Sequence, residues 1–223
     1  MSDDSWPGKI RLITDLERPD HSYLEETDSC AYLGSYTAGG GYKHSRTNDL
    51  VSNLKKSPAV RKTIQWQYKE QAIRTIARTI GANISSDWDN MTFVPVPPSE
   101  LRDTELYDDR MARVAKLLHE HADVREVIYA HTKREAMHAS SNKRDPAALK
   151  ATLAVDPDLV ANPRPTVILL DDVLTTGCSF KVCQALIREI WPSCSVHGLF
   201  VARRVPVKID WFDDVDEDYS DLV

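Results

Sequence analysis

A β-branched and apolar run at residues 166–170 is followed directly by Asp171 and Asp172, and then by a hydroxyl-rich turn that contains Gly177. Runs of this kind are typical of strands that are buried on both faces of a parallel sheet. Residues 179–190 then place apolar side chains at helical spacing. Because helices must cover both faces of a parallel sheet, this strand–turn–helix unit predicts an α/β fold.

The rest of the chain repeats this alternation. Strands are expected at residues 30–37, 92–96, 124–129 and 196–201, and long helices at residues 59–80 and 108–121. Asn48 or Asp49 is expected to cap a short helix that stops before Pro58, and Gly81 to end the first long helix. Residues 132–161 are polar and weakly periodic, which predicts a long connection.

This order predicts a single domain, residues 1–223, whose central and mostly parallel sheet is flanked by helices. Residues 91–205 would form its ligand-binding core. Residues 1–90 would form an N-terminal helical extension or hood, and residues 206–223 an acidic tail.

Composition narrows the functional class. A formal net charge of −6 gives no sign of a general nucleic-acid or membrane-surface binder. The start of the chain lacks a cationic segment followed by an apolar run, and no apolar run is long enough to span a bilayer. The four cysteines form no Cys-x-x-Cys pair, so neither a zinc ribbon nor a redox pair is expected. We therefore expect a cytoplasmic protein with reduced thiols.

The turn after the acidic pair has the chemistry of a phosphate site. Gly177 permits a tight backbone path, and the start of the following helix contributes amide donors and a partial positive charge. Thr175, Thr176 and Ser179 add hydroxyl donors. Asp171 and Asp172 suit two vicinal hydroxyls or a bound Mg²⁺. Together these groups predict a site for a phosphorylated ribose; the alternative is an acidic strand end with an ordinary helix entry.

Residues 167–179 resemble the phosphoribosyl-pyrophosphate (PRPP) signature of type I phosphoribosyltransferases. The resemblance implies that Asp171 and Asp172 are catalytic, hold the ribose hydroxyls and hold Mg²⁺, largely through the substrate. It also implies that the turn binds the 5-phosphate. The turn residues are Thr175, Thr176, Gly177, Cys178 and Ser179, with Cys178 where the family often has Ala or Gly.

Residues 93–99 resemble the pyrophosphate loop of the same family, and are closest to its ComF-like branch. The resemblance implies that Pro97, Pro98, Ser99 and Arg102 meet the pyrophosphate, and two successive prolines make a cis bond an open expectation. The alternative is a proline-rich surface turn. ComF relatives carry a cysteine zinc ribbon that this chain lacks, so a role tied to that ribbon does not transfer.

Residues 130–138 resemble the flexible catalytic loop of these enzymes. Such a loop implies a catalytic role for Lys133 and pyrophosphate binding by Arg134, with Lys143 and Arg144 as further candidates. A loop of this kind can close over a substrate and exclude water. The alternative is a solvated basic loop without a ligand.

The resemblance implies transfer of the phosphoribosyl group to a nitrogen nucleophile, with release of pyrophosphate. Thr175 stands where enzymes for 6-oxopurines usually carry Asp, which counts against a hypoxanthine–guanine enzyme, and the acceptor base stays unidentified. A PRPP synthetase would need a duplicated domain. A non-catalytic sensor of PRPP or of a nucleotide monophosphate, such as an accessory of a DNA-uptake or defence system, remains the alternative. Family members often form homodimers.

Overall fold

The computed structural model describes residues 6, 8–84, 87–133 and 145–206. In this part of the chain, six strands form the main sheet in the order β1-β2-β8-β7-β3-β4. Pairs β2–β8, β8–β7, β7–β3 and β3–β4 are parallel, and only β1 pairs antiparallel to its neighbour. The predicted α/β class with a mostly parallel sheet is confirmed. The strands are β1 (Arg11–Leu12), β2 (Cys30–Thr37), β3 (Met91–Pro95), β4 (Asp123–Val124), β7 (Thr166–Leu174) and β8 (Ser195–Val205).

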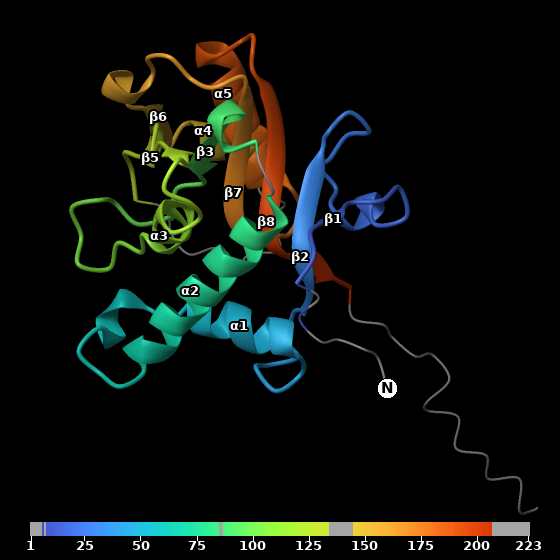
Figure 1. Ribbon diagram of the computed structural model, residues 1–223, viewed down its shortest axis with the longest axis vertical. Helices are drawn as coiled ribbons and strands as arrows, with labels where there is room; N and C mark the ends of the chain where they lie inside the picture. The colour runs from blue at the N-terminus through green and yellow to red at the C-terminus, as the bar shows by residue number, and fades with distance from the viewer. Residues whose placement is uncertain (1–5, 7, 85–86, 134–144, 207–223) are drawn as a thin grey trace, which may run out of the picture.

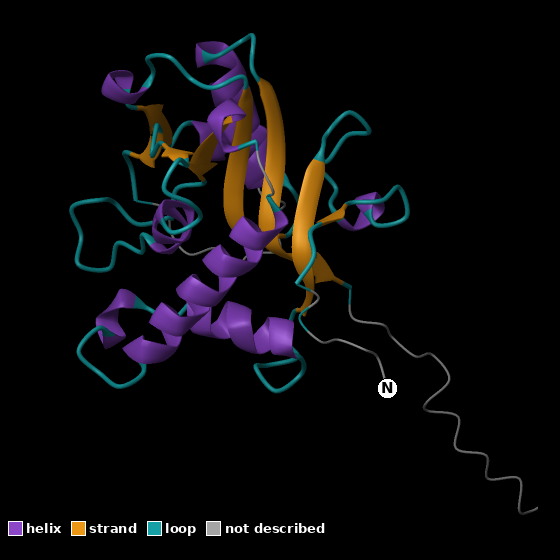
Figure 2. Cartoon of the chain, in the orientation of Figure 1, coloured by secondary structure: helices purple, strands orange, loops and turns teal. Residues whose placement is uncertain are grey.

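Helices cover both faces of this sheet (Figures 1 and 2). Helices α1 (Arg46–Leu54), α2 (Trp66–Asn83) and α3 (Arg110–Lys116) bury their apolar faces in one core cluster, together with Leu170 of β7 and Val201 of β8. On the other face, α5 (Cys178–Ile190) packs in a second cluster that includes Leu169 and Phe200. From Val167 to Leu170 the side chains of β7 alternate between these two cores.

A second, two-stranded sheet lies beside the main one. Strand β5 (Ile128–Ala130) pairs antiparallel with β6 (Leu153–Val155), and helix α4 (Pro146–Lys150) precedes β6. The segment from 132 to 161 is therefore not a plain connection, because it contributes a helix, a strand and the 3-10 turn Pro157–Leu159. Burial of Ile128 and Leu153 against the α5 side of the core explains why these short strands form.

The long N-terminal helix begins later than predicted. Residues 58–60 form a 3-10 turn whose first amide is capped by Ser57, and α2 begins only at Trp66. It also continues past Gly81 to Asn83. A Cβ at Gly81 would lie 2.8 Å from the carbonyl oxygen of Leu118. This glycine thus permits close packing of two segments instead of ending a helix.

Three further boundaries differ from the sequence prediction. Ser45, not Asn48 or Asp49, caps α1, because its hydroxyl accepts the amide of Asn48 at 3.0 Å. The predicted helix at 108–121 is shorter, Arg110–Lys116. The predicted strand at 124–129 is split between β4 and β5, which belong to different sheets. Arg125 lies at this break, and its guanidinium donates to the carbonyl oxygen of Asn162 at 2.8 Å.

Residues 1–90 contribute directly to the main sheet. Strand β2 was correctly predicted at 30–37, and it pairs with β8 from Cys30 to Thr37. Helices α1 and α2 also come from this region and cover one face of the sheet. A role of these residues as a hood over a ligand stays a prediction. In the described part of the chain, no helix has the length and apolarity that crossing a membrane requires.

Candidate functional site

Strand β7 extends further than the sequence predicted. It continues from Thr166 to Leu174, so the acidic pair lies inside the strand and not directly after it. Successive side chains of a strand point to opposite faces. Asp171 lines a pocket with Phe180 and Phe200 of the α5 core cluster, whereas Asp172 pairs with Arg110 of α3 and with Lys55 at the end of α1. The two carboxylates do not converge on one point.

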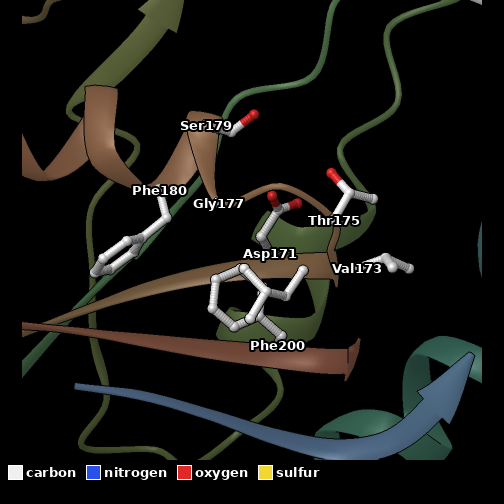
Figure 3. A pocket seen from close by; sticks show the side chains of 8 residues that line it. Asp171, Val173, Thr175, Gly177, Ser179, Phe180 and Phe200 are labelled. Carbon is white, nitrogen blue, oxygen red and sulfur yellow. The ribbon is translucent and has the colours of Figure 1, made fainter. Parts of the chain in front are cut away.

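A small pocket lies on the Asp171 side, between the end of β7 and the start of α5. It is a shallow recess, whose roughly 200 Å³ of empty space includes open solvent. Figure 3 shows the Asp171 carboxyl and the hydroxyls of Thr175 and Ser179 near the turn, together with the rings of Phe180 and Phe200, which are almost fully buried. Its lining residues are Asp171, Val173, Leu174, Thr175, Gly177, Ser179, Phe180 and Phe200.

Gly177 forms the N-terminal boundary of α5 in a left-handed conformation, with φ of +85°. This conformation is readily adopted only by glycine, and it turns the chain from β7 into α5 within a few residues. The first amides of α5 have no intrahelical acceptor, so they can serve an anion. Ser179 lines the pocket, while the thiol of Cys178 is buried in the core. Burial of Cys178 agrees with a packing role.

The environment of Asp171 favours its protonated form. Burial, and then the charge of Asp172, raise the pKa of Asp171 to about 7. The amide of Asp172 donates to Asp171 Oδ1 at 2.7 Å and opposes this change only in part. Near neutral pH, the Asp171 carboxyl can therefore exist in either protonation state, as donor or as acceptor.

The environment of Asp172 has the opposite effect. Its side chain is 8% exposed, and burial alone would raise its pKa; Arg110 and Lys55 outweigh burial and lower the pKa to about 2. Arg110 Nε donates to Asp172 Oδ2 at 2.9 Å, and a terminal guanidinium nitrogen contacts the same oxygen. Lys55 Nζ lies 3.1 Å from Asp172 Oδ1. Asp172 is thus an ionised carboxylate held by two cations.

The charges around Asp172 continue into a buried network. Arg110 also donates to Asp108 Oδ2 at 2.6 Å, and the same oxygen accepts from Lys69 Nζ at 2.8 Å. Lys69 is fully buried and donates in addition to the carbonyl oxygens of Leu54 and Lys56. Burial lowers the pKa of Lys69, against the opposing effect of Asp108. No sequence motif indicates Arg110 or Lys69 as a partner of the acidic pair.

The predicted pyrophosphate loop begins beside the acidic pair. Pro95 of β3 lies opposite Leu170 of β7, and Val96 N donates to Leu170 O at 2.9 Å. Pro97, Pro98 and Ser99 therefore follow β3 at the same edge of the sheet at which Asp171 follows Leu170 in β7. All peptide bonds of the described residues are trans, including those of Pro97 and Pro98.

Arg102 lies against the small sheet. It donates to Glu126 O at 2.6 Å, its guanidinium lies 4.9 Å from the ring centre of Tyr129, and it pairs with Asp156 at 3.6 Å. Its side chain is thus engaged by the β5–β6 unit and the residues beside it. That Arg102 meets pyrophosphate stays a prediction.

Lys133 connects the other two predicted elements. Its Nζ lies 3.2 Å from Glu100 Oε1, next to Ser99 in the chain. The base of the predicted catalytic loop thus touches the predicted pyrophosphate loop. Arg134, Lys143 and Arg144 lie outside the described residues.

His21 and Tyr23 also contact the turn after β7, which the sequence analysis did not expect. His21 is fully buried, and its Nδ1 contacts the carbonyl oxygen of Thr175. Tyr23 N donates to Thr176 O at 2.9 Å. No sequence motif links His21 to a turn that lies more than 150 positions later.

A metal centre built from the protein alone is not found in the part of the chain that the structure describes, where no three His, Cys, Asp or Glu side chains gather. This donor set does fit Mg²⁺ that is held mainly by a substrate. Mg²⁺ usually takes one or two carboxylates and completes its shell with water and phosphate oxygens. Asp171 offers such a carboxylate at the pocket, whereas Asp172 is already paired with two cations.

No protein-family model matches the chain, and no curated protein matches it. Among solved structures, the chain is similar to the crystal structure of a hypoxanthine phosphoribosyltransferase from Staphylococcus aureus. The two share 15% sequence identity with a TM-score of 0.35, over 63% of this chain and 77% of that chain. The interpretation of the site therefore depends on its own residues.

Proposed function

We propose that the chain binds PRPP with Mg²⁺ and transfers its phosphoribosyl group to a nitrogen nucleophile, releasing pyrophosphate. The observation that carries this proposal is the turn between β7 and α5. Gly177 at φ of +85° precedes the first-turn amides of a 13-residue helix, and the hydroxyls of Thr175 and Ser179 line the same pocket. Amides, hydroxyls and a helix N-terminus together suit a phosphate monoester.

Asp171 is the carboxyl that would hold the ribose hydroxyls. It lies in the same pocket as the turn, so one ligand with a 5-phosphate and a vicinal diol would meet both. Asp172 lies on the opposite face of β7, so it would influence the ligand site only through its ion pairs with Arg110 and Lys55.

The pyrophosphate side would use the loop after β3 and the base of the loop at Lys133. Lys133 is paired with Glu100, so it would exchange this carboxylate for the pyrophosphate when substrate binds. Mg²⁺ would supply charge neutralisation on the leaving pyrophosphate, in contact with Asp171. The reaction would depend mainly on positioning and on stabilisation of charge, since the transition state has oxocarbenium character.

The decisive experiment is to incubate the protein with PRPP, Mg²⁺ and a panel of nucleobases, and to measure pyrophosphate. Release that depends on one base supports transfer and names the acceptor, and release without any base indicates hydrolysis. Asp171→Asn should abolish either activity, because it changes the carboxyl in the pocket at constant size. The matched control is Asp89→Asn, at an exposed position of the 3-10 turn before β3, which should retain activity. Absence of both PRPP binding and release would refute the proposal.

A non-catalytic sensor of PRPP or of a nucleotide monophosphate is the second candidate. The cationic side chains that are predicted to bind pyrophosphate already have protein partners, which favours a sensor. Arg102 is engaged by Glu126 and Asp156, and Lys133 is engaged by Glu100. A sensor would bind PRPP in calorimetry and leave it intact in the presence of every base. The same incubation therefore separates the two candidates.

A further inference from the structure

A segment far from the turn in sequence lies directly against it. Residues 17–28, which we call the N-terminal strap, belong to the segment of the chain that connects β1 to β2 (Figure 1). Within the strap, His21 Nδ1 contacts the carbonyl oxygen of Thr175, and Tyr23 N donates to that of Thr176 at 2.9 Å. Two consecutive carbonyl groups of the turn are therefore bound by the strap.

The strap is held by contacts of its own. The buried carboxylate of Asp28 accepts from Lys181 Nζ at 2.9 Å, from Gln184 Nε2 at 3.1 Å and from Glu25 N at 2.8 Å. Lys181 and Gln184 both belong to α5, the helix that follows the turn. At the other end of the strap, Glu17 pairs with Arg203 at 3.0 Å. These contacts position the strap before any ligand arrives.

The bound carbonyls fix the direction of the neighbouring amides. In a trans peptide the C=O and the following N–H point in opposite directions, and all described peptide bonds are trans. The carbonyl of Thr175 shares a peptide with the amide of Thr176, and the carbonyl of Thr176 with that of Gly177. Both amides consequently point away from the strap.

Leu24 closes the strap over the glycine. A Cβ at Gly177 would lie 2.9 Å from Leu24 Cδ2. The strap therefore covers one side of the turn, while Gly177, Thr175 and Ser179 line the pocket. The turn has one side for the strap and one side for a ligand.

The chemistry of His21 suits this role. A carbonyl oxygen only accepts, so Nδ1 must carry the proton, and Nε2 is buried without a hydrogen-bond partner among the described residues. Burial lowers the pKa of His21, although its bond to Thr175 opposes this. Burial therefore disfavours the doubly protonated, charged form of this imidazole.

We propose that the N-terminal strap, through His21 and the backbone of Tyr23, orients the amides of Thr176 and Gly177 toward the 5-phosphate. His21 is then a positioning residue, which touches the turn and not the ligand. This inference depends on the proposed phosphate site and adds a specific residue to it. It also links residues that precede the second strand to the affinity for the sugar phosphate.

The test compares two variants of His21 that differ in one donor. His21→Asn keeps an N–H donor near the position of Nδ1, whereas His21→Leu fills similar space without any donor. Glu25→Gln is the control, because it changes a strap residue whose 69%-exposed side chain pairs with Lys181 and does not touch the turn. The measurements are the affinity for ribose 5-phosphate by calorimetry and the unfolding midpoint of each variant.

His21→Leu should weaken ribose 5-phosphate binding about tenfold, the effect of one buried hydrogen bond. His21→Asn should restore most of the affinity, and Glu25→Gln should bind like the native protein. If His21→Leu binds ribose 5-phosphate as tightly as the native protein does, the inference is overturned, while the proposed function stays intact. If the native protein itself fails to bind ribose 5-phosphate, the phosphate site fails, and the inference with it.

A measurement on the native protein covers the case in which His21→Leu does not fold. Nitrogen NMR of the histidine ring reports which nitrogen carries the proton. The inference requires a neutral His21 protonated at Nδ1, with the amide signals of Thr176 and Gly177 shifting when ribose 5-phosphate is added. A ring protonated only at Nε2 would overturn it, because such an Nδ1 cannot donate to a carbonyl.

Discussion

Asp171 and Asp172 are neighbours in sequence, yet their carboxylates lie on opposite faces of β7. Asp171 lines the pocket beside the turn, and Asp172 is paired with Arg110 and Lys55 under the helices. This arrangement separates a ligand-facing acid from a fold-stabilising acid. It is the basis of the first two predictions.

Substitution of the two acids should have different effects on stability. Asp172→Asn leaves Arg110 without its buried carboxylate, and removal of one partner of such a pair costs about 3–5 kcal/mol. Asp171→Asn should leave the free energy of unfolding at neutral pH unchanged or higher, while it weakens binding of ribose 5-phosphate. Urea unfolding and calorimetry of both variants check this. Equal losses of stability would show that the two carboxylates share one environment.

Stability should depend on pH through Asp171. In the unfolded chain this acid loses its proton near its ordinary pKa of 3.8, whereas the folded protein retains the proton to about pH 7. Between these values the folded state binds more protons, so its contribution to the free energy of unfolding falls as pH rises. Asp171→Asn should remove this decrease. Asp172 has a lowered pKa, so its contribution is lost only at more acidic pH, toward about 2.

The measurement is urea unfolding of the native protein and of Asp171→Asn, from about pH 4 to about pH 8. The difference in unfolding free energy, variant minus native, should grow across this window and level off above it. A difference that is independent of pH would mean that the Asp171 carboxyl has an ordinary pKa.

Gly177→Ala should destabilise the protein and weaken sugar-phosphate binding together. A left-handed alanine costs about 1–2 kcal/mol, and the new Cβ would also press on Leu24. Gly39→Ala is the matched control: its φ is +81°, but nothing lies within 4 Å of the added carbon. The control should lose stability through backbone strain alone and keep its affinity. Equal affinity losses in both variants would argue against a special role for the turn at Gly177.

Lys69→Met should destabilise the protein strongly. The substitution leaves the carbonyl oxygens of Leu54 and Lys56 without a donor and leaves Asp108 with Arg110 alone. Breaking a buried pair in this way costs about 3–5 kcal/mol. Lys62→Met is the control, since Lys62 is exposed and surface changes usually stay within about 0.5 kcal/mol. Thermal and urea unfolding measure the stability of both variants. A small effect of Lys69→Met would mean that the Lys69 ammonium is exposed to solvent.

The sequence predicted the central unit of the fold well, because β7, the turn and α5 are adjacent in the chain and their signals are local. The length of β7 was not predictable from such signals. Acidic residues are unfavourable inside a strand. Asp172 is accommodated only because Arg110 and Lys55 reach it from helices that lie elsewhere in the sequence.

The start of α2 and the partners of the turn were missed for the same reason. Apolar spacing begins near Val60, but Ser57 and Pro58 favour a 3-10 turn that delays the helix to Trp66. His21 carries no motif, and only the folded chain brings it to Thr175. Tertiary contacts of this kind cannot be derived from the periodicity of one segment.

The position of β8 between β2 and β7 has a consequence for the order of folding. Strand β2 ends at Thr37, but its parallel neighbour β8 begins only at Ser195. The sheet therefore joins segments that are separated by most of the chain. Topologies with such distant pairings fold slowly, because the chain entropy of a long loop is lost before the contacts form. During synthesis, β2, α1 and α2 must therefore wait, with apolar surface uncovered, until β8 emerges. A chaperone that binds exposed apolar segments would meet this protein at that stage.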